Sequence, residues 1–551
     1  MNSDKRPFPA RARAIRMIGR NLLPWLLAVA VTSVSGSLIQ SHLNLINVVE
    51  MGSYATWQDW HRTVVHDLGA FMPFYAVLVG VAFLVAFPIA LRLSRRWPAG
   101  RSTLFVLAGA LGLAVAFFIA DVVAPIPTLI SGTRGVLGYC AMIASGMLGA
   151  LVFEQLLGRS VNRSRRSLTY AHFAFPLVIL IGAFSLHVAM RPERASTFDD
   201  LPADRYRIAT LADGLEHPWA MIRLPDGRVL ITERPGAIRI VDKDGALLKE
   251  AIEGLPEILQ GVQGGLMDLE MSPDYEQDRL LFMTYACGTI EENNLCVGSG
   301  RLEGFRIVAF EELFQARPLK NTAVQFGSRI AFLPDRTLLV SIGDGFDFRE
   351  DAQDLSNHIG TVVRLNMDGS VPEDNPFVDQ PDVRPEIYSY GHRNPQGLHF
   401  DAATGAVYAS EHGPYGGDEV NRIAAGKNYG WPIATEGINY PGSNITPHEG
   451  LDEIEAPLTH WTPSIAPSGI TVYRGRAFPE FDGDLLVAAL AGNAVFRMQL
   501  DDGNVVSQQR LFHELGQRIR DVTVGEEGQL YLLTDHAPGA LLRIDSAAKP
   551  E

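Results

Sequence analysis

At 551 residues the chain is too long for one ordinary hydrophobic core, so the sequence predicts two or more domains. Charge divides it in two. Residues 1–195 hold 18 basic and 7 acidic residues, a balance of +11, and the remainder holds 29 basic and 55 acidic residues, a balance of −26. The acidic second half argues against nucleic acid as a partner, because phosphate binding needs a basic face.

The first half contains five apolar runs, each about as long as the roughly 20 residues that cross the hydrocarbon core of a bilayer. Few charges interrupt them and short polar loops separate them, which favours membrane-spanning helices over buried helices of a soluble protein. No small-residue cleavage site follows the first run, so it is not interpreted as a signal peptide. The predicted spans are Asn21–Leu43, Ala70–Leu91, Thr103–Val123, Val136–Leu157 and Ala171–Met190.

Basic residues in the loops predict the orientation of these spans. Six precede the first span, four lie between the second and third, and four between the fourth and fifth, whereas the other two loops carry only Arg62 and Arg134. Positive loops stay in the cytoplasm, so the N-terminus is expected inside and everything after about Arg191 outside. The sequence thus predicts a multi-pass protein of the bacterial inner membrane, with a transmembrane domain over 1–192, a linker over 193–205 and a periplasmic domain over 206–546.

The cysteines are unevenly distributed. Cys140 lies in an apolar run, while Cys287 and Cys296 flank a polar loop in the second half. This pair could hold a metal, but no His or second Cys pair stands near to complete four ligands. Two free thiols are the other alternative. A loop-closing disulfide is expected, because an oxidising compartment such as the periplasm preserves it.

From Tyr206 onward short β runs replace the apolar helices, and one unit recurs six times. Most copies hold an apolar strand, a turn such as Pro-Asp-Gly and a second apolar strand, a pattern typical of β-hairpins. A single hairpin cannot bury its apolar face, whereas radial repetition of hairpins does. The repeat therefore predicts an all-β, six-bladed β-propeller rather than a sandwich. Its copies begin at Pro218, Gly264, Ser328, Gln396, Ser468 and Arg520.

A series of motifs in this half, taken together and in this order, resembles the glucose/sorbosone dehydrogenase family of PQQ-dependent aldose dehydrogenases, which have six blades. The motifs are QGGLMD at Gln263, FGSRIAF at Phe326, SIGDG at Ser341, GHRNPQGLHF at Gly391, SEHGPYGGDEVN at Ser410, KNYGWP at Lys427, WTPSIAPSG at Trp461 and RIRDV at Arg518. The resemblance runs from about Leu215 to Ile544. It implies an enzyme that oxidises the anomeric carbon of a sugar by hydride transfer to PQQ.

The resemblance also implies where PQQ binds. This tricarboxylate with an ortho-quinone needs cations for its carboxylates. Arg518 and Arg520 alternate on one strand and are expected to point the same way. In the family this motif clamps the carboxylates, and two surface arginines are the alternative. Arg393 and Asn394 match residues at the quinone end, with a structural Arg–carboxylate pair as the alternative. Two further positions match substrate- and cofactor-facing residues: Gln263 and Trp461, the second of which could equally pack in the core.

Calcium is the second cofactor that the resemblance implies. Gly413 and Pro414 match positions whose backbone carbonyls hold a Ca²⁺ against the cofactor, and carbonyl oxygens suit this hard cation. Glu419 and Tyr429 match positions linked to a second, structural Ca²⁺. An ordinary Gly-Pro turn is the alternative for the first pair.

The position of the catalytic base departs from the family pattern. Oxidising an aldose needs a group that takes the hydroxyl proton, and a His suits this task. In the family a His precedes the segment that matches FGSRI, and an Asp that matches Asp344 orients it. Here Gln325 stands in that place, and an amide cannot accept a proton at physiological pH. A family Lys that contacts PQQ falls at Ala491. His358 or His412, in neighbouring loops, could substitute for the base.

Two functions of different classes remain. The leading expectation is a membrane-anchored, periplasmic PQQ- and Ca²⁺-dependent sugar dehydrogenase, with Gln325, Asp344 and Arg393 at its catalytic end, which could pass electrons to a membrane quinone. The alternative is a non-catalytic propeller that lost its base and binds a sugar or a protein. A Ca²⁺-dependent lactonase fits less well, because the motifs match the dehydrogenase branch.

Overall fold

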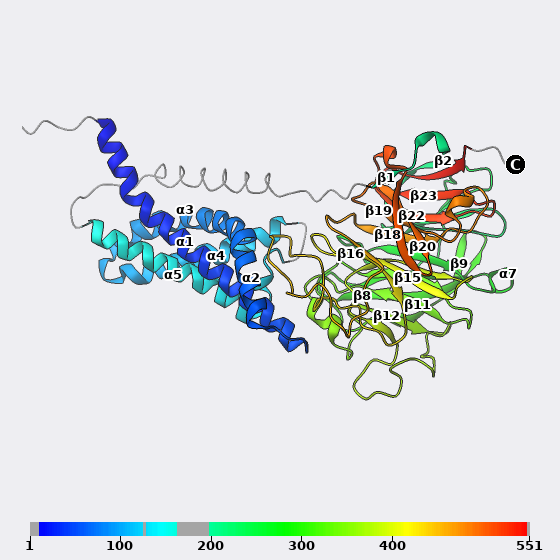
Figure 1. The fold of residues 1–551 in the computed structure, drawn as a ribbon, viewed down its shortest axis with the longest axis horizontal. Helices are drawn as coiled ribbons and strands as arrows, with labels where there is room; N and C mark the ends of the chain where they lie inside the picture. Colours follow the sequence, from blue (N-terminus) through cyan, green and yellow to red (C-terminus); the bar gives the residue numbers. More distant parts are fainter. Residues whose placement is uncertain (1–9, 125–127, 162–197, 548–551) are drawn as a thin grey trace, which may run out of the picture. The chain divides into compact units, whose positions relative to one another are not determined.

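The computed structural model describes residues 10–124, 128–161 and 198–547 (Figure 1). Contacts divide the chain into two compact units, Met1–Glu193 with Asn439–Pro447, and Arg194–Ile438 with His448–Glu551. The first unit is helical and the second is built from β-sheets.

The described part of the helical unit has four helices that are long and apolar enough to cross a membrane, over Leu22–Glu50, Met72–Arg96, Pro98–Val123 and Gly135–Leu157. The first four predicted spans are thereby confirmed as long apolar helices. The fifth, Ala171–Met190, lies outside the described residues. The helices are α1 (Ala10–Glu50), α2 (Trp57–Ala70), α3 (Met72–Arg96), α4 (Arg101–Val123) and α5 (Gly135–Val161), with short 3₁₀ turns at Pro98–Gly100 and Ser131–Thr133.

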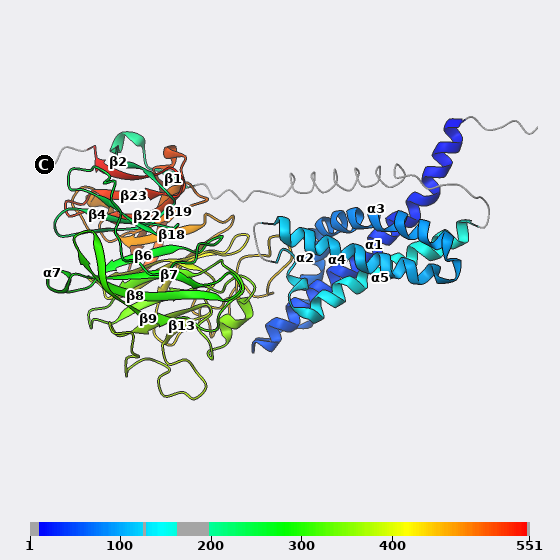
Figure 2. The ribbon, with the colours of Figure 1, turned by 180° about the vertical axis from the view of Figure 1, so that it is seen from behind.

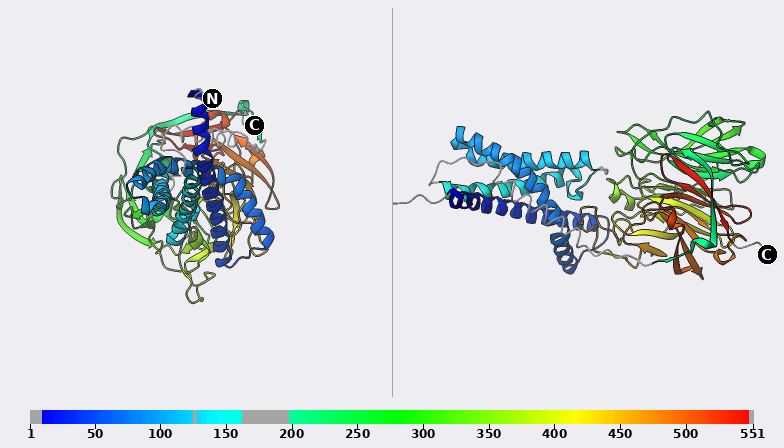
Figure 3. Two further views of the ribbon diagram at one scale, coloured as in Figure 1. Left: turned by 90° about the vertical axis from the view of Figure 1, so that its left-hand side faces the viewer. Right: turned by 90° about the horizontal axis from the view of Figure 1, so that it is seen from above.

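Glycines let the long helices run close beside one another (Figure 3). A Cβ added to Gly36 of α1 would lie 2.2 Å from the ring of Tyr75 in α3, and one added to Gly149 of α5 would lie 2.0 Å from the Thr32 hydroxyl of α1. Such small residues are typical of helix contacts in membranes, where van der Waals packing replaces the hydrophobic effect.

Helix α2 was not predicted. Thr56 caps it: the Thr56 side chain accepts a hydrogen bond from the Asp59 amide, and the Asp59 carboxylate accepts one from the Thr56 amide at 2.8 Å. On its buried face, Asp67 accepts a hydrogen bond from Ser41 of α1 at 2.7 Å. The sequence signal for this helix was the Thr-x-x-Asp capping box at Thr56.

The β-unit is a six-bladed propeller, and the six predicted repeats are confirmed as its blades. From the inner strand outward, consecutive strands of each blade pair antiparallel, as β6 to β9 show in Figure 2. The first strands are β3 (Pro218–Arg223), β6 (Leu266–Met271), β10 (Gly327–Phe332), β14 (Pro395–Asp401), β18 (Pro467–Val472) and β22 (Ile519–Val524). They neighbour one another around the ring and so form its inner wall.

The other strands complete the blades outward. They are β4 (Val229–Glu233) and β5 (Ala237–Val241); β7 (Leu280–Gly288), β8 (Asn293–Glu303) and β9 (Arg306–Gln315); β11 (Leu338–Ile342), β12 (Thr361–Leu365) and β13 (Ile387–Tyr390); β15 (Ala406–Glu411), β16 (Asp418–Ile423) and β17 (Thr459–Trp461); β19 (Leu485–Ala489), β20 (Ala494–Asp501) and β21 (Asn504–Leu511); and β23 (Leu530–Thr534) and β24 (Gly539–Ser546). One helical turn, α7 (Tyr275–Asp278), joins β6 to β7, and 3₁₀ turns lie at Ala203–Arg205, Arg349–Gln353, Pro479–Phe481 and His513–Leu515.

The ring is closed by strands from the start of the unit. Strand β2 (Tyr206–Leu215) pairs antiparallel with β24 and completes the last blade, and the short β1 (Asp199–Asp200) pairs parallel with β21. Closure of this kind leaves few exposed sheet edges. The predicted disulfide is present: Cys287 of β7 and Cys296 of β8 are bonded, and Cys140 is a free, exposed thiol.

Candidate active site

The residues predicted for the base and the cofactor gather at one end of the inner strands, the end at which β10, β14 and β22 begin. Gln325 lies directly before β10, Arg393 and Asn394 directly before β14, and Arg520 at the start of β22. Asp344 follows β11, which pairs antiparallel with β10, so the start of one strand and the end of the other meet here. We call this end the mouth.

Gln325 stands at the centre of a small hydrogen-bonded corner of the mouth. Its amide donates to Gln263 Oε1 at 2.9 Å, and its carbonyl accepts from the Gly345 amide at 3.3 Å. Asn394 Oδ1 accepts from the amide of Gly327, two residues further, at 3.1 Å. The backbone of Gln325 is left-handed, with φ of 50°. These bonds bring Gln263, Gln325 and Asn394 together.

Asp344 is fully buried in the same corner, where both its carboxylate and its backbone amide are hydrogen-bonded. Its carboxylate accepts from the Phe346 amide and from the Trp431 indole, each at 2.8 Å, and its own amide donates to the Arg393 carbonyl at 2.8 Å. The indole is a partner that sequence reasoning missed, although Trp431 stands in the KNYGWP motif.

Arg393 ties the corner to the loop after β15. Its amide donates to Glu411 Oε2 at 2.8 Å, and its guanidinium donates to the carbonyls of His412 at 2.9 Å and Gly413 at 2.7 Å. The guanidinium also lies 5.4 Å from the Trp431 ring. The charge of Arg393 is therefore held against the Trp431 ring and two carbonyls, one of which is the Gly413 carbonyl of the predicted calcium position.

Arg518 and Arg520 lie next to each other, and both donate to Asp535 Oδ2 at 3.1 Å. Arg520 is buried and also donates to Gln396 Oε1 at 2.6 Å, whereas the Arg518 side chain is 41 % exposed. Burial raises the pKa of Asp535, but the two guanidiniums outweigh it and bring this pKa to about 2. The pair thus carries more positive charge than Asp535 neutralises.

The two histidines proposed as substitute bases have different surroundings. Both ring nitrogens of His358 are engaged: Nδ1 accepts from the Arg317 amide at 3.0 Å, and Nε2 lies 3.3 Å from the Glu386 carboxylate. His412 Nε2 is buried without a hydrogen-bond partner in the described part of the chain. Burial and the nearby Arg393 and Arg520 lower the pKa of His412 to about 3, so its imidazole stays neutral.

The first predicted calcium position has oxygens but few anions. The Gly413 carbonyl already accepts from Arg393, Pro414 is buried beside it, and the Gly413 amide donates to Asp418 Oδ1 at 2.8 Å. Over residues 10–124, 128–161 and 198–547, no three His, Cys, Asp or Glu side chains cluster as a metal site. A cation here would depend on carbonyl oxygens.

The second predicted calcium position contains an acidic pair, of which Glu411 is buried and Glu419 is partly buried. One Asn421 amide group donates to Glu411 at 2.8 Å and to Glu419 at 3.1 Å. Burial and the neighbouring Glu411 raise the pKa of Glu419 to about 8. The Tyr429 hydroxyl donates to the Arg422 carbonyl and accepts from the Ala424 amide, so it is used in both directions.

Two predicted positions differ from the rest. The Trp461 ring is 2 % exposed, packs against Phe496 and donates to Gln508 at 2.9 Å, so it lies in the core between strands, the second of the two readings that the sequence allowed. Ala491, which replaces a cationic family position, is exposed.

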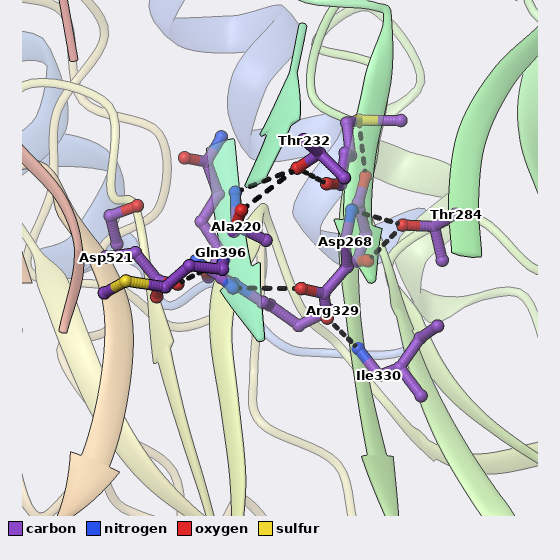
Figure 4. Close-up of polar contacts among 12 residues, drawn as sticks. Ala220, Thr232, Asp268, Thr284, Arg329, Ile330, Gln396 and Asp521 are labelled. Atoms are coloured by element: carbon purple, nitrogen blue, oxygen red, sulfur yellow. Dashed lines mark hydrogen bonds and ion pairs between the residues drawn. The ribbon is translucent and has the colours of Figure 1, made fainter. Parts of the chain in front are cut away.

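A buried ion cluster forms the floor of the mouth (Figure 4). Arg329 of β10 donates to Asp268 of β6 and to Asp521 of β22, each at 3.0 Å, and to the Gln396 carbonyl of β14 at 2.8 Å. Its guanidinium also lies 4.3 Å from the Trp219 ring. The Arg329 side chain therefore joins inner strands of four blades. Gln396 connects it to the arginine pair, because Arg520 donates to the Gln396 side chain.

Comparisons with known proteins show what the propeller is similar to. Residues 215–543 match the family model described as Glucose / Sorbosone dehydrogenase. The chain is 38 % identical to the aldose sugar dehydrogenase YliI of Escherichia coli over 61 % of this chain and 92 % of that protein. The crystal structure of the soluble aldose sugar dehydrogenase of E. coli in its apo form superposes with a TM-score of 0.60 at 38 % identity, covering 62 % of this chain and 99 % of that one.

A third relative has its cofactor in place. The PQQ-bound form of the aldose sugar dehydrogenase of Streptomyces coelicolor has a TM-score of 0.52 at 27 % identity, and the match covers 63 % of this chain and 100 % of that one. Because the family model spans more than half of the residues, including every blade, the chain belongs to the glucose/sorbosone dehydrogenase family.

Proposed function

We propose that this chain is a membrane-anchored, PQQ-dependent aldose dehydrogenase whose propeller faces the periplasm. The carrying observation is a set of three buried polar atoms around the mouth, Gln325 Oε1, His412 Nε2 and Arg520 Nε, which find no hydrogen-bond partner in the described part of the chain. A buried polar atom without a partner costs about 1–3 kcal/mol. Three at one place fit a site whose missing partner is a polar ligand.

The charge of the mouth fits an anionic cofactor. Arg518 and Arg520 share one carboxylate, and both can turn further N–H donors to the carboxylates of PQQ. Arg393 and Asn394 lie beside the base position, where they would orient the quinone end. PQQ bound here would supply an ortho-quinone that accepts a hydride from the anomeric carbon of the sugar.

The site is weakest in its acceptor for the proton of the sugar hydroxyl. Gln325 cannot accept it, and Asp344, which orients a base in the family, is bound here to a backbone amide and an indole. His412 has an unpartnered Nε2, but its pKa of about 3 makes it a weak proton acceptor. We therefore expect slow aldose oxidation.

Calcium is proposed at the first position only through carbonyl oxygens. The Gly413 and Pro414 carbonyls would bind it together with oxygens of the cofactor, and the Gly413 carbonyl would be shared with Arg393. At the second position the raised pKa of Glu419 fits a carboxylate that a cation could stabilise in its charged form.

One experiment tests the proposed function. The full chain in detergent is mixed with PQQ and Ca²⁺, bound PQQ is followed by its absorbance, and a panel of aldoses is then added with a dye acceptor. A bound-cofactor band with turnover supports the dehydrogenase. A band without turnover indicates an inactive site. If no absorbance band appears, the result favours the second candidate, a sugar- or protein-binding propeller. Gln325 and Ala491, which replace family residues, support this candidate.

The arginine pair gives a prediction for PQQ affinity. We expect Arg520→Ala to weaken PQQ binding by about 1.5–3 kcal/mol, the range of a hydrogen bond to a charged group, and Arg518→Ala to cost less, because water screens the more exposed side chain. Arg543→Ala, which removes an exposed partner of Asp545 in the same blade, is the control. Titration of each variant with PQQ measures the effect. Unchanged affinity in both Arg518 and Arg520 variants would place the clamp elsewhere.

The orientation in the membrane gives a second prediction. The loop charges place the N-terminus in the cytoplasm and, with the fifth predicted span, the propeller in the periplasm, where a membrane quinone could take the electrons. A disulfide such as Cys287–Cys296 fits that oxidising compartment. A periplasm-specific reporter fused after Glu551 should be active, and a cytoplasm-specific reporter silent. The reverse pattern would contradict the predicted topology.

A further inference from the structure

Lys320, which belongs to none of the motifs, lies against the backbone of Gln325. Its side chain is fully buried, and its backbone is fixed by two hydrogen bonds with Asn293, at 2.7 and 2.8 Å. Its ammonium group lies 3.5 Å from the carbonyl oxygens of Val324 and Gln325 and 4.4 Å from the centre of the Phe326 ring. The amine therefore contacts the peptide that carries the base position.

The loop of Asp344 covers the other side of this lysine. A Cβ added to Gly345 would lie 2.4 Å from Lys320 Cδ, so the loop rests on the stem of the side chain. Thr322 strengthens that contact by donating to the Gly345 carbonyl at 2.6 Å. Lys320 is thus enclosed between the two segments that hold a His and an Asp in other members of the family.

Lys320 and Asp344 interact electrostatically. Burial lowers the pKa of Lys320 from its ordinary value of 10.5 to about 7, against the attraction of the Asp344 carboxylate. Asp344 is the charged group that faces the amine. The other groups packed against it, from the segment Val324–Phe326 and from Gly345, are neutral. The amine gains and loses its proton near neutral pH, next to a fully buried carboxylate.

We propose that Lys320 is a positioning residue of this active site: it takes the place of the missing imidazole as the charge partner of Asp344, and it holds the Gln325 peptide that lines the mouth. The proposal deepens the proposed function and rests on it. The left-handed backbone of Gln325 and the long contacts of its carbonyl, to Gly345 and to the amine, make this peptide dependent on its neighbours.

A first test needs no cofactor. Between about pH 7 and 10.5 the unfolded chain holds a proton on this lysine and the folded chain does not, so stability rises with pH in that window. Lys320→Met removes this contribution. We expect the difference in Tm between wild type and Lys320→Met, measured on the full chain in detergent, to change by about 5 °C in favour of wild type from pH 6.5 to 9. Lys427→Met, which removes an exposed lysine paired with Glu455, should keep the wild-type dependence.

A second variant keeps the test decisive if Lys320→Met does not fold. Asp344→Asn removes the attraction that raises the lysine pKa, so the rise of Tm should begin at lower pH than in wild type. Parallel pH curves for wild type, Lys320→Met and Asp344→Asn would overturn the pairing, whether or not PQQ binds.

The PQQ-loaded protein supplies the functional readout. We expect Lys320→Met to lower kcat by roughly 10- to 100-fold, the usual cost of losing a partner that orients a functional group, and to lose any step of kcat near pH 7, while PQQ affinity stays within about threefold. An unchanged kcat and pH profile would remove the positioning role. Absence of PQQ binding in wild type would instead refute the proposed function and leave the Tm test of the Lys320–Asp344 pair valid.

Discussion

Replacing Gln325 by histidine is expected to raise aldose turnover of the PQQ-loaded protein by about 10²- to 10⁴-fold, the contribution of a positioned general base. The side chains are similar in volume, and the site already has the backbone bonds that hold residue 325, from its amide to Gln263 and from Gly345 to its carbonyl. An imidazole there could accept the hydroxyl proton and donate its other N–H to Asp344.

The measurement is kcat with a dye acceptor in wild type, Gln325→His and the control Gln260→His, which adds a histidine at an exposed glutamine. A large gain in Gln325→His alone supports an impaired dehydrogenase site. Fast wild-type turnover that the substitution leaves unchanged assigns the base to another group, with His412 the first to test. No turnover and no bound PQQ in either protein would favour the binding propeller.

Loss of Arg329 is expected to have the largest effect on stability. Arg329→Met leaves Asp268 and Asp521 buried without their guanidinium, and breaking a buried ion pair in this way costs about 3–5 kcal/mol. Arg301→Met removes an exposed partner of Glu303 and should cost at most about 1 kcal/mol. Urea unfolding of the full chain in detergent measures both.

The pH dependence of that loss identifies its cause. Burial already raises the pKa of Asp268 to about 6 with Arg329 in place, and without Arg329 it must rise further. Protonation of Asp268 at lower pH removes the unpaired charge, so the deficit of Arg329→Met should be larger at pH 8 than at pH 5. A deficit that is equal at both pH values would point to lost packing against Trp219 instead.

How much the sequence predicts depends on whether the signal is local. The repeated strand–turn–strand pattern located the inner strand of every blade, because neighbouring residues determine a β-hairpin. The family resemblance, carried by the motifs, implied that Gln325, Asp344 and Arg393 share one site. The partners of these residues carry no motif of their own: the Trp431 indole that donates to Asp344 comes from a segment 87 residues away, and the Lys320 amine, five residues before Gln325, reaches the Gln325 carbonyl only because the chain folds back there.

The same limit explains the side-chain orientations that the sequence left open. Trp461 stands in a motif next to mouth residues, and only the packing of its ring against Phe496 decides that it belongs to the core. The sequence left His358 as a possible base. In the structure both of its ring nitrogens have partners, one of which is the Arg317 amide, 41 residues earlier in the chain. Helix α2 is the opposite case, because its capping box was readable at Thr56.

Closure of the ring by β2 has a consequence for how the protein is made. Strand β2 pairs with β24, so the first strand to be synthesised in the last blade waits for the last strand of the chain, more than 300 residues later. Until Gly539–Ser546 is synthesised, Tyr206–Leu215 offers an unpaired strand edge. A chain truncated before β24 would therefore keep its long apolar helices and carry an open sheet edge, a substrate for chaperones and proteases rather than a shorter propeller.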